Sequence, residues 1–192
     1  MRDTPILEEV IQQQFVLPKF WVNLLIGSLL SFVPLVNIFA FGYLYQVFRG
    51  VRRLGQPAMP PWHDWKELFI DGLRFTVVFL CYWIAPILLA AGMGSILKHF
   101  GLGIFSSIFF LSILLFSNIL FLAALFHYHS GESFKDLLNF RLILENTRTI
   151  FPKLLVSSIL FLGIFLWLLP FYGFSLFGGL LLLLTYASLH HY

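Results

Sequence analysis

Charged residues are absent from four long stretches of this chain, and this absence constrains the fold more than any other feature. No Asp, Glu, Lys or Arg occurs in residues 20–48, 75–97, 100–130 or 154–192. A continuous apolar run of about 18 or more residues is long enough to cross a bilayer as a helix. Only 11% of the 192 residues are charged, against about 25% in a typical soluble domain. We therefore expect an all-α, polytopic transmembrane protein whose excess apolar surface is covered by lipid.

Hydropathy and proline positions divide the chain into segments of a single membrane domain, residues 1–192. We expect about five hydrophobic helices, with cytoplasmic interfacial helices beginning at Asp64 and covering 134–148. Pro170 and Gly173 divide the last apolar stretch into two helices, 154–169 and 174–189. The predicted segments are an amphipathic N-terminal segment (1–18), a first hydrophobic segment (20–48), an interfacial loop (49–72), a helical hairpin (73–97 and 104–126), a second interfacial loop (127–153) and a C-terminal helix pair (154–189).

The first hydrophobic segment, 20–48, is compatible with two structures. As one helix it would be about 43 Å long, which exceeds a hydrocarbon core of about 30 Å. One structure is a single tilted helix that is kinked at Pro34. The other is a re-entrant pair of shorter helices that enters and leaves on the same side, with its backbone covered by protein. Both alternatives stay open from the sequence, and the side of the N-terminus depends on them.

The distribution of Lys and Arg predicts the topology. Basic residues concentrate in the two long loops, whereas the connection at 98–103 contains only Lys98. Because basic loops stay in the cytoplasm, we expect both long loops and the C-terminus on that side. The basic residues, which give a net charge of +3, lie beside membrane segments. Anionic headgroups of the bilayer are therefore the expected partner, and nucleic acid is not. The loop residues are Arg49, Arg52, Arg53, Lys66 and Arg74 in the first loop and Lys135, Arg141, Arg148 and Lys153 in the second.

Aromatic and acidic residues mark the first loop. Trp21, Trp62 and Trp65 are predicted to lie at the membrane interface, where amphipathic rings accumulate. Asp64, Glu67 and Asp71 share one helical face. One interpretation is an acidic stripe that holds a divalent cation or a cationic partner. The other is helix capping by Asp64 together with pairing of the acids with nearby Arg or Lys.

A second charged ladder consists of Arg141, Glu145 and Arg148, spaced i, i+4 and i+7 on the predicted helix 134–148. Charges on an otherwise apolar face are costly unless they are paired or placed at phosphates. We consider two roles equally. In one, Arg141 and Arg148 dock against Asp64, Glu67 and Asp71, which joins the two loops. In the other, they contact lipid headgroups directly.

The remaining polar residues do not form a catalytic site. No Ser-His-Asp order, phosphate loop or zinc motif is present, so we do not expect an enzyme. His127 and His190, near the predicted cytoplasmic helix ends, could ligate a haem or, with His129 and His191, a transition metal. Polar residues that end each helix at the interface are the favoured explanation, and we expect no cofactor. Seven polar residues of the apolar segments could line a passive pathway, but interhelical hydrogen bonds are their simpler explanation: Ser28, Ser31, Asn37, Ser106, Ser112, Ser117 and Asn118.

Two blocks resemble a known family. The first is Pro34-Leu-Val-Asn37 followed by Gly42-Tyr43-Leu44 and the basic residues 49–53. The second is Pro61-Trp62-His-Asp64-Trp65-Lys-Glu67-Leu68-Phe69-Ile-Asp71-Gly72-Leu73. Two further segments, Phe134–Arg141 and Pro170-Phe-Tyr, are also similar to the pattern of the same family. They are similar to domain of unknown function 4013, a family of bacterial and archaeal membrane proteins. The chain departs from the family's pattern at His63 and at the paired Pro60-Pro61. The resemblance implies a multi-pass protein of a prokaryotic inner membrane and brings no catalytic residues.

Three functions follow as hypotheses. The first is a non-enzymatic scaffold or accessory subunit, which would bind other membrane subunits or a second copy of itself. The second is a passive channel or small-solute transporter. The third is a membrane protein that binds haem or a metal. The small size and the aromatic cytoplasmic loop favour the first, because interfaces are enriched in aromatic side chains.

Overall fold

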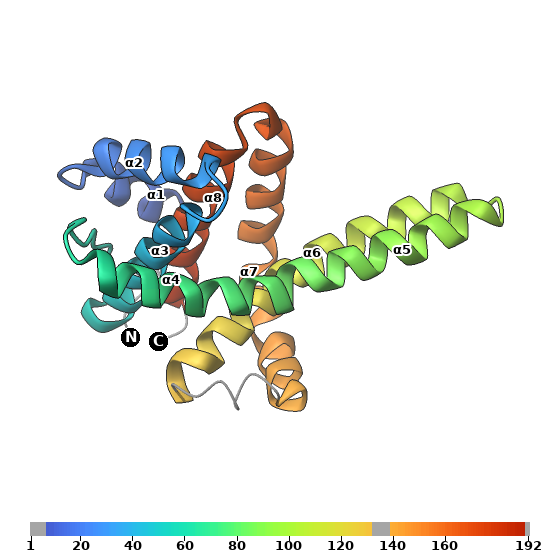
Figure 1. Ribbon diagram of the computed structural model, residues 1–192. Helices are drawn as coiled ribbons and strands as arrows, with labels where there is room; N and C mark the ends of the chain where they lie inside the picture. Colours follow the sequence, from blue (N-terminus) through green and yellow to red (C-terminus); the bar gives the residue numbers. More distant parts are fainter. Residues whose placement is uncertain (1–6, 132–138, 191–192) are drawn as a thin grey trace. The chain divides into compact units, whose positions relative to one another are not determined.

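The computed structural model (Figure 1) describes residues 7–131 and 139–190, which are helical and contain no strand. The predicted all-α architecture is therefore confirmed. The helices belong to two compact units: residues 1–76 with 159–192 form the first unit, and residues 77–158 form the second unit. In chain order the elements are α1 (Leu7–Val16), α2 (Phe20–Phe32), α3 (Asn37–Leu54), α4 (Trp65–Phe79), the π-helical turn η1 (Leu80–Ile84), α5 (Ala85–His99), α6 (Gly103–Gly131), α7 (Phe140–Trp167), the 3₁₀ turn η3 (Leu169–Phe171) and α8 (Tyr172–His190).

The N-terminal segment forms α1, which ends before Pro18. Proline cannot continue the hydrogen bonding of a helix, and Lys19 adopts a positive φ of 65°. As a result α1 and α2 meet at an angle of 97°. The predicted amphipathic segment is thus a separate helix that turns sharply into the first hydrophobic segment.

The first hydrophobic segment contains two helices, α2 and α3, and not a single helix kinked at Pro34. The chain breaks at residues 33–36 around Pro34, where Leu35 has a φ of 71°. α3 then continues to Leu54 and ends at Gly55, whose φ of 66° is the left-handed conformation typical of a glycine cap. The prediction that residues 49–54 belong to a loop is therefore wrong. Arg49, Arg52 and Arg53 lie on the last turns of α3, where basic side chains favour the helix C-terminus.

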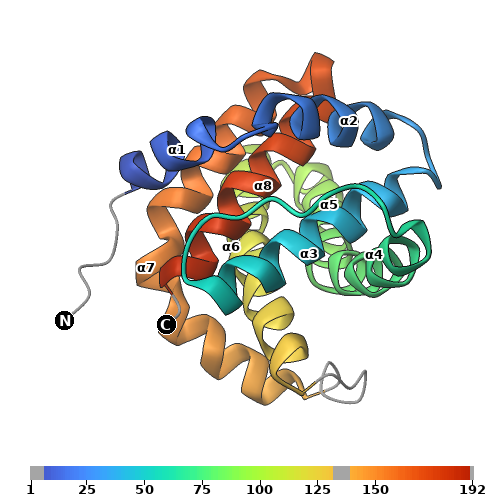
Figure 2. The same cartoon turned by 90° about the vertical axis from the view of Figure 1, so that its left-hand side faces the viewer.

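Helix α8 forms the core of the first unit. Figure 2 shows α1, α2 and α3 lying around it, and α8 buries Phe177, Leu180 and Leu184 completely. Gly27 of α2 faces the Phe177 ring so closely that an added Cβ would lie 2.0 Å from it. The break at Pro170 that precedes α8 was predicted. It packs against the break at Pro34, because the Tyr172 hydroxyl donates a hydrogen bond of 2.6 Å to the Phe32 carbonyl.

Helical structure runs without interruption from Trp65 to His99. The helix predicted to begin at Asp64 and the predicted span 73–97 are therefore one continuous helix. Nothing in residues 71–74 stops a helix, because the only glycine there, Gly72, is tolerated inside one. Pro86 changes the local geometry of this helix. Proline has no backbone N–H, so the carbonyl one turn earlier loses its usual hydrogen-bond donor. Residues 80–84, just before it, form a wider π-helical turn in which the Ala85 N–H donates to Leu80 O.

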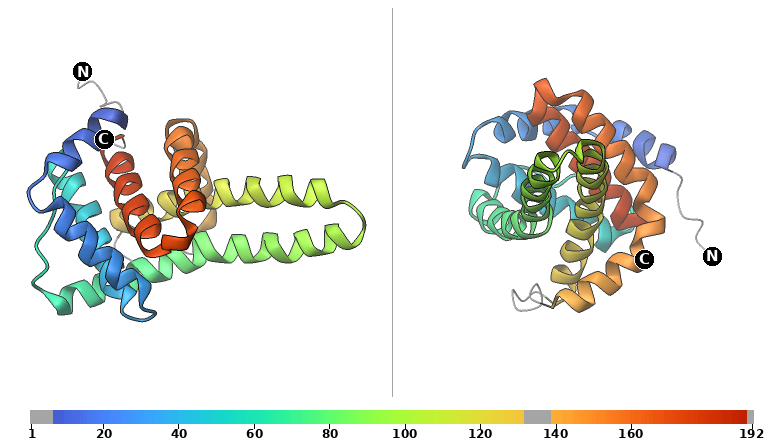
Figure 3. Two further views of the ribbon diagram at one scale, coloured as in Figure 1. Left: turned by 90° about the horizontal axis from the view of Figure 1, so that it is seen from above. Right: turned by 90° about the vertical axis from the view of Figure 1, so that its right-hand side faces the viewer.

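In the second unit, α5 and α6 form a hairpin, seen side by side in the left-hand view of Figure 3. The predicted tight turn is confirmed: Gly101 has a φ of 76°, and Leu102 N–H bonds Leu97 O at 3.0 Å. α6 extends to Gly131, beyond its predicted end at 126.

Helix α7 differs from its prediction. It passes through Pro152 without ending, so a separate interfacial helix that stops at Arg148 is wrong. Apolar helices tolerate an internal proline because neighbouring groups satisfy the freed carbonyl. Residues 134–138 of that predicted helix lie outside the described part of the chain.

Four described helices are long and apolar enough to cross a membrane. They are Trp65–His99, Gly103–His129, Phe140–Trp167 and Tyr172–Leu189, and the bent pair α1 and α2 could supply a fifth crossing. This agrees with the prediction of about five hydrophobic helices, although the bent pair covers residues 8–32 and not the predicted first segment, 20–48.

Candidate functional site at the crossing of α3 and α4

Two glycines bring the backbones of α3 and α4 into direct contact. A Cβ added to Gly42 would lie 1.9 Å from the Leu68 carbonyl oxygen, and one added to Gly72 would lie 1.9 Å from the Ile38 carbonyl oxygen. No side chain larger than hydrogen fits at either position. The crossing therefore fixes the distance between the charged residues that both helices carry next to it.

Aromatic rings hold this crossing on both sides. Phe39 of α3 packs against Trp65 and Phe69 of α4, with ring centroids 5.5 and 5.8 Å apart. Phe41 packs against Phe75 at 5.2 Å. Aromatic pairs at such distances contribute about 0.5–1.5 kcal/mol beyond the area that they bury. The two helices are thus held at a defined angle.

Asp71 lies buried at the crossing, with 1% of its side chain exposed. Its Oδ1 accepts hydrogen bonds from Arg49 of α3 at 3.5 Å and from Arg74 of α4 at 3.3 Å. Arg49 also pairs with Glu67 at 3.4 Å. A buried carboxylate needs such partners, because an unpaired charge in a protein interior is very costly. Glu67 and Asp71 are therefore paired with arginines, as the second of the two interpretations predicted.

Asp64 caps the start of α4. Its Oδ1 accepts a hydrogen bond of 3.1 Å from the Glu67 backbone N–H. This satisfies one of the donors that have no partner in the first turn of a helix. The Glu67 side chain pairs with Arg49. The predicted helix start at Asp64 is confirmed.

Trp62 connects the loop at residues 55–64 with two helices. Its ring stacks on Tyr43 of α3 with centroids 4.1 Å apart, and its Nε1–H donates to Asn23 Oδ1 of α2 at 3.1 Å. Protein groups thus occupy both its ring face and its N–H. Trp21 and Trp65 are 61% and 49% exposed, and the interfacial position of the three tryptophans stays a prediction.

We expect Trp62→Leu to release this loop. The substitution removes the stack on Tyr43 and leaves Asn23 without its indole donor. Cleavage by proteinase K between residues 55 and 61 in detergent should accelerate at least tenfold. Trp21→Leu, at an exposed position, serves as the control and should leave the cleavage rate unchanged. Equal rates in the two variants would contradict the role of Trp62.

A hollow of about 350 Å³ lies beside these charges, and six of its lining residues are charged. Three basic and three acidic side chains face it, so its walls carry no net formal charge. Asp71 at its base is fixed by the two arginines. The lining residues are Arg49, Asp64, Lys66, Glu67, Ile70, Asp71 and Arg74.

The other predicted charged residues lie elsewhere. Arg52 sits over the Phe48 ring at 5.9 Å, and Arg53 is exposed at the end of α3. Arg141 pairs with Glu145 at 3.3 Å on an exposed face of α7, and Arg148 is exposed further along this helix. The docking of Arg141 on the acidic residues stays a prediction, as does its contact with headgroups.

Most of the predicted polar pathway residues have other uses. Ser31, Ser112 and Ser117 donate to carbonyls of their own helices, and Ser106 of α6 donates to Gly94 O of α5. Asn118 of α6 is completely buried, and neither of its amide atoms has a partner among the described residues.

Within the described ranges, no three His, Cys, Asp or Glu side chains gather as a metal site would require.

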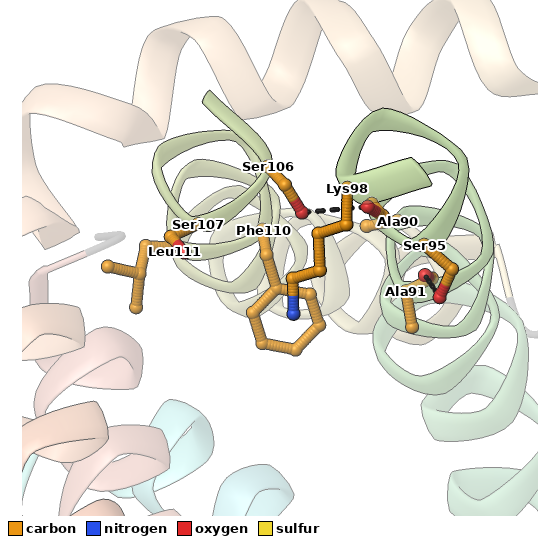
Figure 4. Close-up of a pocket in the computed structure, with 9 residues that line it drawn as sticks. Ala90, Ala91, Ser95, Lys98, Ser106, Ser107, Phe110 and Leu111 are labelled. Carbon is orange, nitrogen blue, oxygen red and sulfur yellow. Dashed lines mark hydrogen bonds between the residues drawn. The ribbon is translucent and has the colours of Figure 1, made fainter. Parts of the chain in front are cut away.

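A groove of about 470 Å³ runs between α5 and α6 (Figure 4). Small side chains line most of it, among them Ala90, Ala91 and Gly94 of α5 and Ser107 of α6. In Figure 4 the Lys98 side chain extends alongside the Phe110 ring. Both walls belong to the second unit.

The fold defines a multi-pass α-helical membrane protein, with four long apolar helices and a bent N-terminal pair. The chain belongs to the family described as Protein of unknown function (DUF4013), which it matches over residues 26–185. This match confirms the resemblance seen in the sequence and includes both helices of the crossing. No curated protein and no solved structure matches the chain.

Sequence reasoning missed the parts that Gly42, Tyr43 and Asn23 have in this site. Gly42 and Tyr43 were noticed only as members of a family motif. Asn23 had no local signal, because its partner Trp62 lies 39 residues away. The available hint of a close helix crossing was a glycine on each helix, Gly42 on α3 and Gly72 on α4.

Proposed function

We propose that this protein is a non-enzymatic accessory subunit that packs against another protein inside the bilayer. The observation that carries the proposal is the groove between α5 and α6. It lies on a hairpin of two apolar helices and is lined by small side chains, a surface that suits the close approach of a further transmembrane helix.

The polar groups of the groove support a packing role. Ser95 donates to Ala91 O at 3.0 Å, Ser106 to Gly94 O at 2.8 Å and Ser107 to Gly103 O at 3.2 Å. Because these hydroxyl donors are already used, the groove offers shape and van der Waals contact more than hydrogen bonds to a solute. Ala91 and Ser95, spaced i and i+4 and both exposed in the groove, leave room for the backbone of a partner helix.

The apolar rims of the hairpin extend this surface. Leu89 and Met93 of α5 are 70% and 54% exposed, and Ile104 and Leu111 of α6 are 77% and 56% exposed. Lipid or a partner helix must cover these side chains in the membrane. Packing between transmembrane helices depends on shape complementarity, and a groove flanked by large side chains offers more of it than a flat face.

The proposed location is the cytoplasmic membrane of a prokaryote, with the C-terminus in the cytoplasm. The family resemblance supports the type of membrane. The orientation follows from the basic residues, which concentrate on α3, at the start of α4 and on the first half of α7, while the opposite end of the α5–α6 hairpin has only Lys98.

Filling the groove should release the partner. Ala91 and Ser107 are exposed groove residues, so Ala91→Phe or Ser107→Phe fills the groove without removing an internal contact of a buried side chain. Native mass spectrometry after gentle extraction should show a defined additional subunit on the unmodified protein. Its occupancy should fall at least tenfold in either variant, which corresponds to about 1.4 kcal/mol. Leu88→Phe, which is 66% exposed and lies outside the groove, is the matched control.

A clean homo-oligomer series that carries only lipid would overturn the accessory-subunit proposal. The passive pathway would then be the next hypothesis, and the buried, unpartnered amide of Asn118 is the observation that favours it. A visible absorption band would instead indicate a bound cofactor. These outcomes distinguish the three classes in one preparation.

A further inference from the structure

We propose that the hollow beside the first turns of α4 binds a phospholipid whose phosphate carries a primary ammonium, the phosphoethanolamine headgroup. The hollow measures about 350 Å³ and has both basic and acidic walls. It lies in the first unit, so this inference is independent of the proposed docking groove between α5 and α6.

The position of the hollow along the helix points to a lipid. Arg74 is the last charged residue before residues 75–97, which carry no Asp, Glu, Lys or Arg. At 1.5 Å per residue that stretch is about 35 Å long, close to the hydrocarbon thickness of a bilayer. The preceding two turns of α4 therefore lie at the depth of the headgroups. Trp65, Phe69 and Ile70 are 49%, 44% and 42% exposed there, as interfacial side chains are.

The basic wall is arranged for a phosphate. Lys66, Ile70 and Arg74 follow one another at i, i+4 and i+8 on one face of α4, so the two cationic side chains can converge over Ile70. Arg74 is held by the buried Asp71 and is still 43% exposed. Lys66 forms no ion pair within the described part of the chain. A phosphate would supply the anion that Lys66 lacks, through charge-assisted hydrogen bonds.

The acidic wall selects the rest of the headgroup. Glu67 is 52% exposed although it pairs with Arg49, and Asp64 is exposed at the helix start. Their free carboxylate oxygens can accept hydrogen bonds from a primary ammonium. A phosphate without an ammonium would leave these carboxylates facing an anion, and a quaternary ammonium has no N–H to donate. The three basic and three acidic side chains of the hollow give a net formal charge of zero. A zwitterionic headgroup, which also has no net charge, therefore matches the hollow best.

The test uses the purified, delipidated full chain in detergent. It is offered an equimolar mixture of phosphatidylethanolamine, phosphatidylglycerol and phosphatidylcholine with identical acyl chains, and adducts are counted by native mass spectrometry. We expect phosphatidylethanolamine adducts to exceed each of the others at least tenfold. Lys66→Gln should reduce these adducts about tenfold, and Glu67→Gln should abolish the preference over phosphatidylglycerol. Lys153→Gln, which removes an exposed lysine of α7 outside this hollow, should bind like the unmodified chain.

Lys66 is exposed and carries no internal ion pair, so its substitution should leave folding intact, and circular dichroism verifies this. Equal adducts for the three lipids would overturn the proposal, and so would a Lys66→Gln variant that binds unchanged. Competition with soluble phosphoethanolamine distinguishes a site for a lipid headgroup from a site for a water-soluble compound with the same chemical groups. If it displaced the lipid at equal concentration, the site would serve a water-soluble compound and the lipid proposal would fail.

Discussion

Gly42→Ala is expected to destabilise the protein by about 3 kcal/mol, at the upper end of what overpacking costs. The new methyl group would lie 1.9 Å from the Leu68 carbonyl oxygen, well inside van der Waals contact. Because the obstacle is the backbone of α4, no side-chain rotation can relieve the clash, and the two helices must move apart. The free energy of unfolding, measured by titration with sodium dodecyl sulfate in mixed micelles, checks this value.

The same helix provides the control for this prediction. Gly50 is also on α3, and an added Cβ there meets no atom within 4 Å. Gly50→Ala should therefore stabilise the protein slightly, by about 0.5–1 kcal/mol, because alanine loses less conformational entropy in a helix than glycine. If Gly42→Ala were as stable as Gly50→Ala, the close crossing of α3 and α4 would be refuted.

Arg49→Met should destabilise the protein by about 2 kcal/mol. It leaves the buried Asp71 with only Arg74 as an ion-pair partner, and an incompletely compensated buried charge is costly. Combining Arg49→Met with Asp71→Asn should recover part of this loss, because the carboxylate no longer needs a cation. A double-mutant cycle should therefore give a coupling free energy of about 1 kcal/mol or more between the two positions.

An exposed pair on α7 is the comparison for this cycle. Arg141 and Glu145 are 88% and 61% exposed at a separation of 3.3 Å. Pairs of this kind contribute little, because water already solvates both charges. The cycle of Arg141→Met with Glu145→Gln should show no measurable coupling. An equally small coupling between Arg49 and Asp71 would mean that the buried network does not hold the crossing together.

Helices were predictable from the sequence where a physical stop signal was strong. Pro18, Pro34 and Pro170 each end a helix as expected, since each stands beside a turn or a residue with unusual backbone conformation. Pro86 and Pro152 carry the same signal but lie inside continuous helices. The difference is tertiary, because a proline in an apolar helix is tolerated when a wider turn or neighbouring groups compensate for the lost hydrogen bond. Local sequence does not contain that information.

The sequence predicted the acidic residues of the candidate site but only some of their interaction partners. Asp64, Glu67 and Asp71 were identified from their spacing on one helical face, and capping by Asp64 followed from local rules. The partner of Asp71 was not identified, since Arg49 was assigned to a loop and only the helical continuation of α3 brings it there. Side chains 22 residues apart meet here because two glycines permit the helices to touch, a condition that no charge pattern reveals.

The first unit is built from two separate parts of the chain, residues 1–76 and 159–192, and this has a consequence for biosynthesis. Its N-terminal helices depend on α8: Gln14 donates to Thr185, which is 171 positions later, and Tyr172 reaches back to Phe32 across 140 positions. During translation α1, α2 and α3 leave the ribosome long before the helix that fills their core exists. The hairpin of the second unit has its contacts nearby in sequence and can form while the chain is still growing. The first three helices therefore stay without the helix that completes their core until α8 has been synthesised.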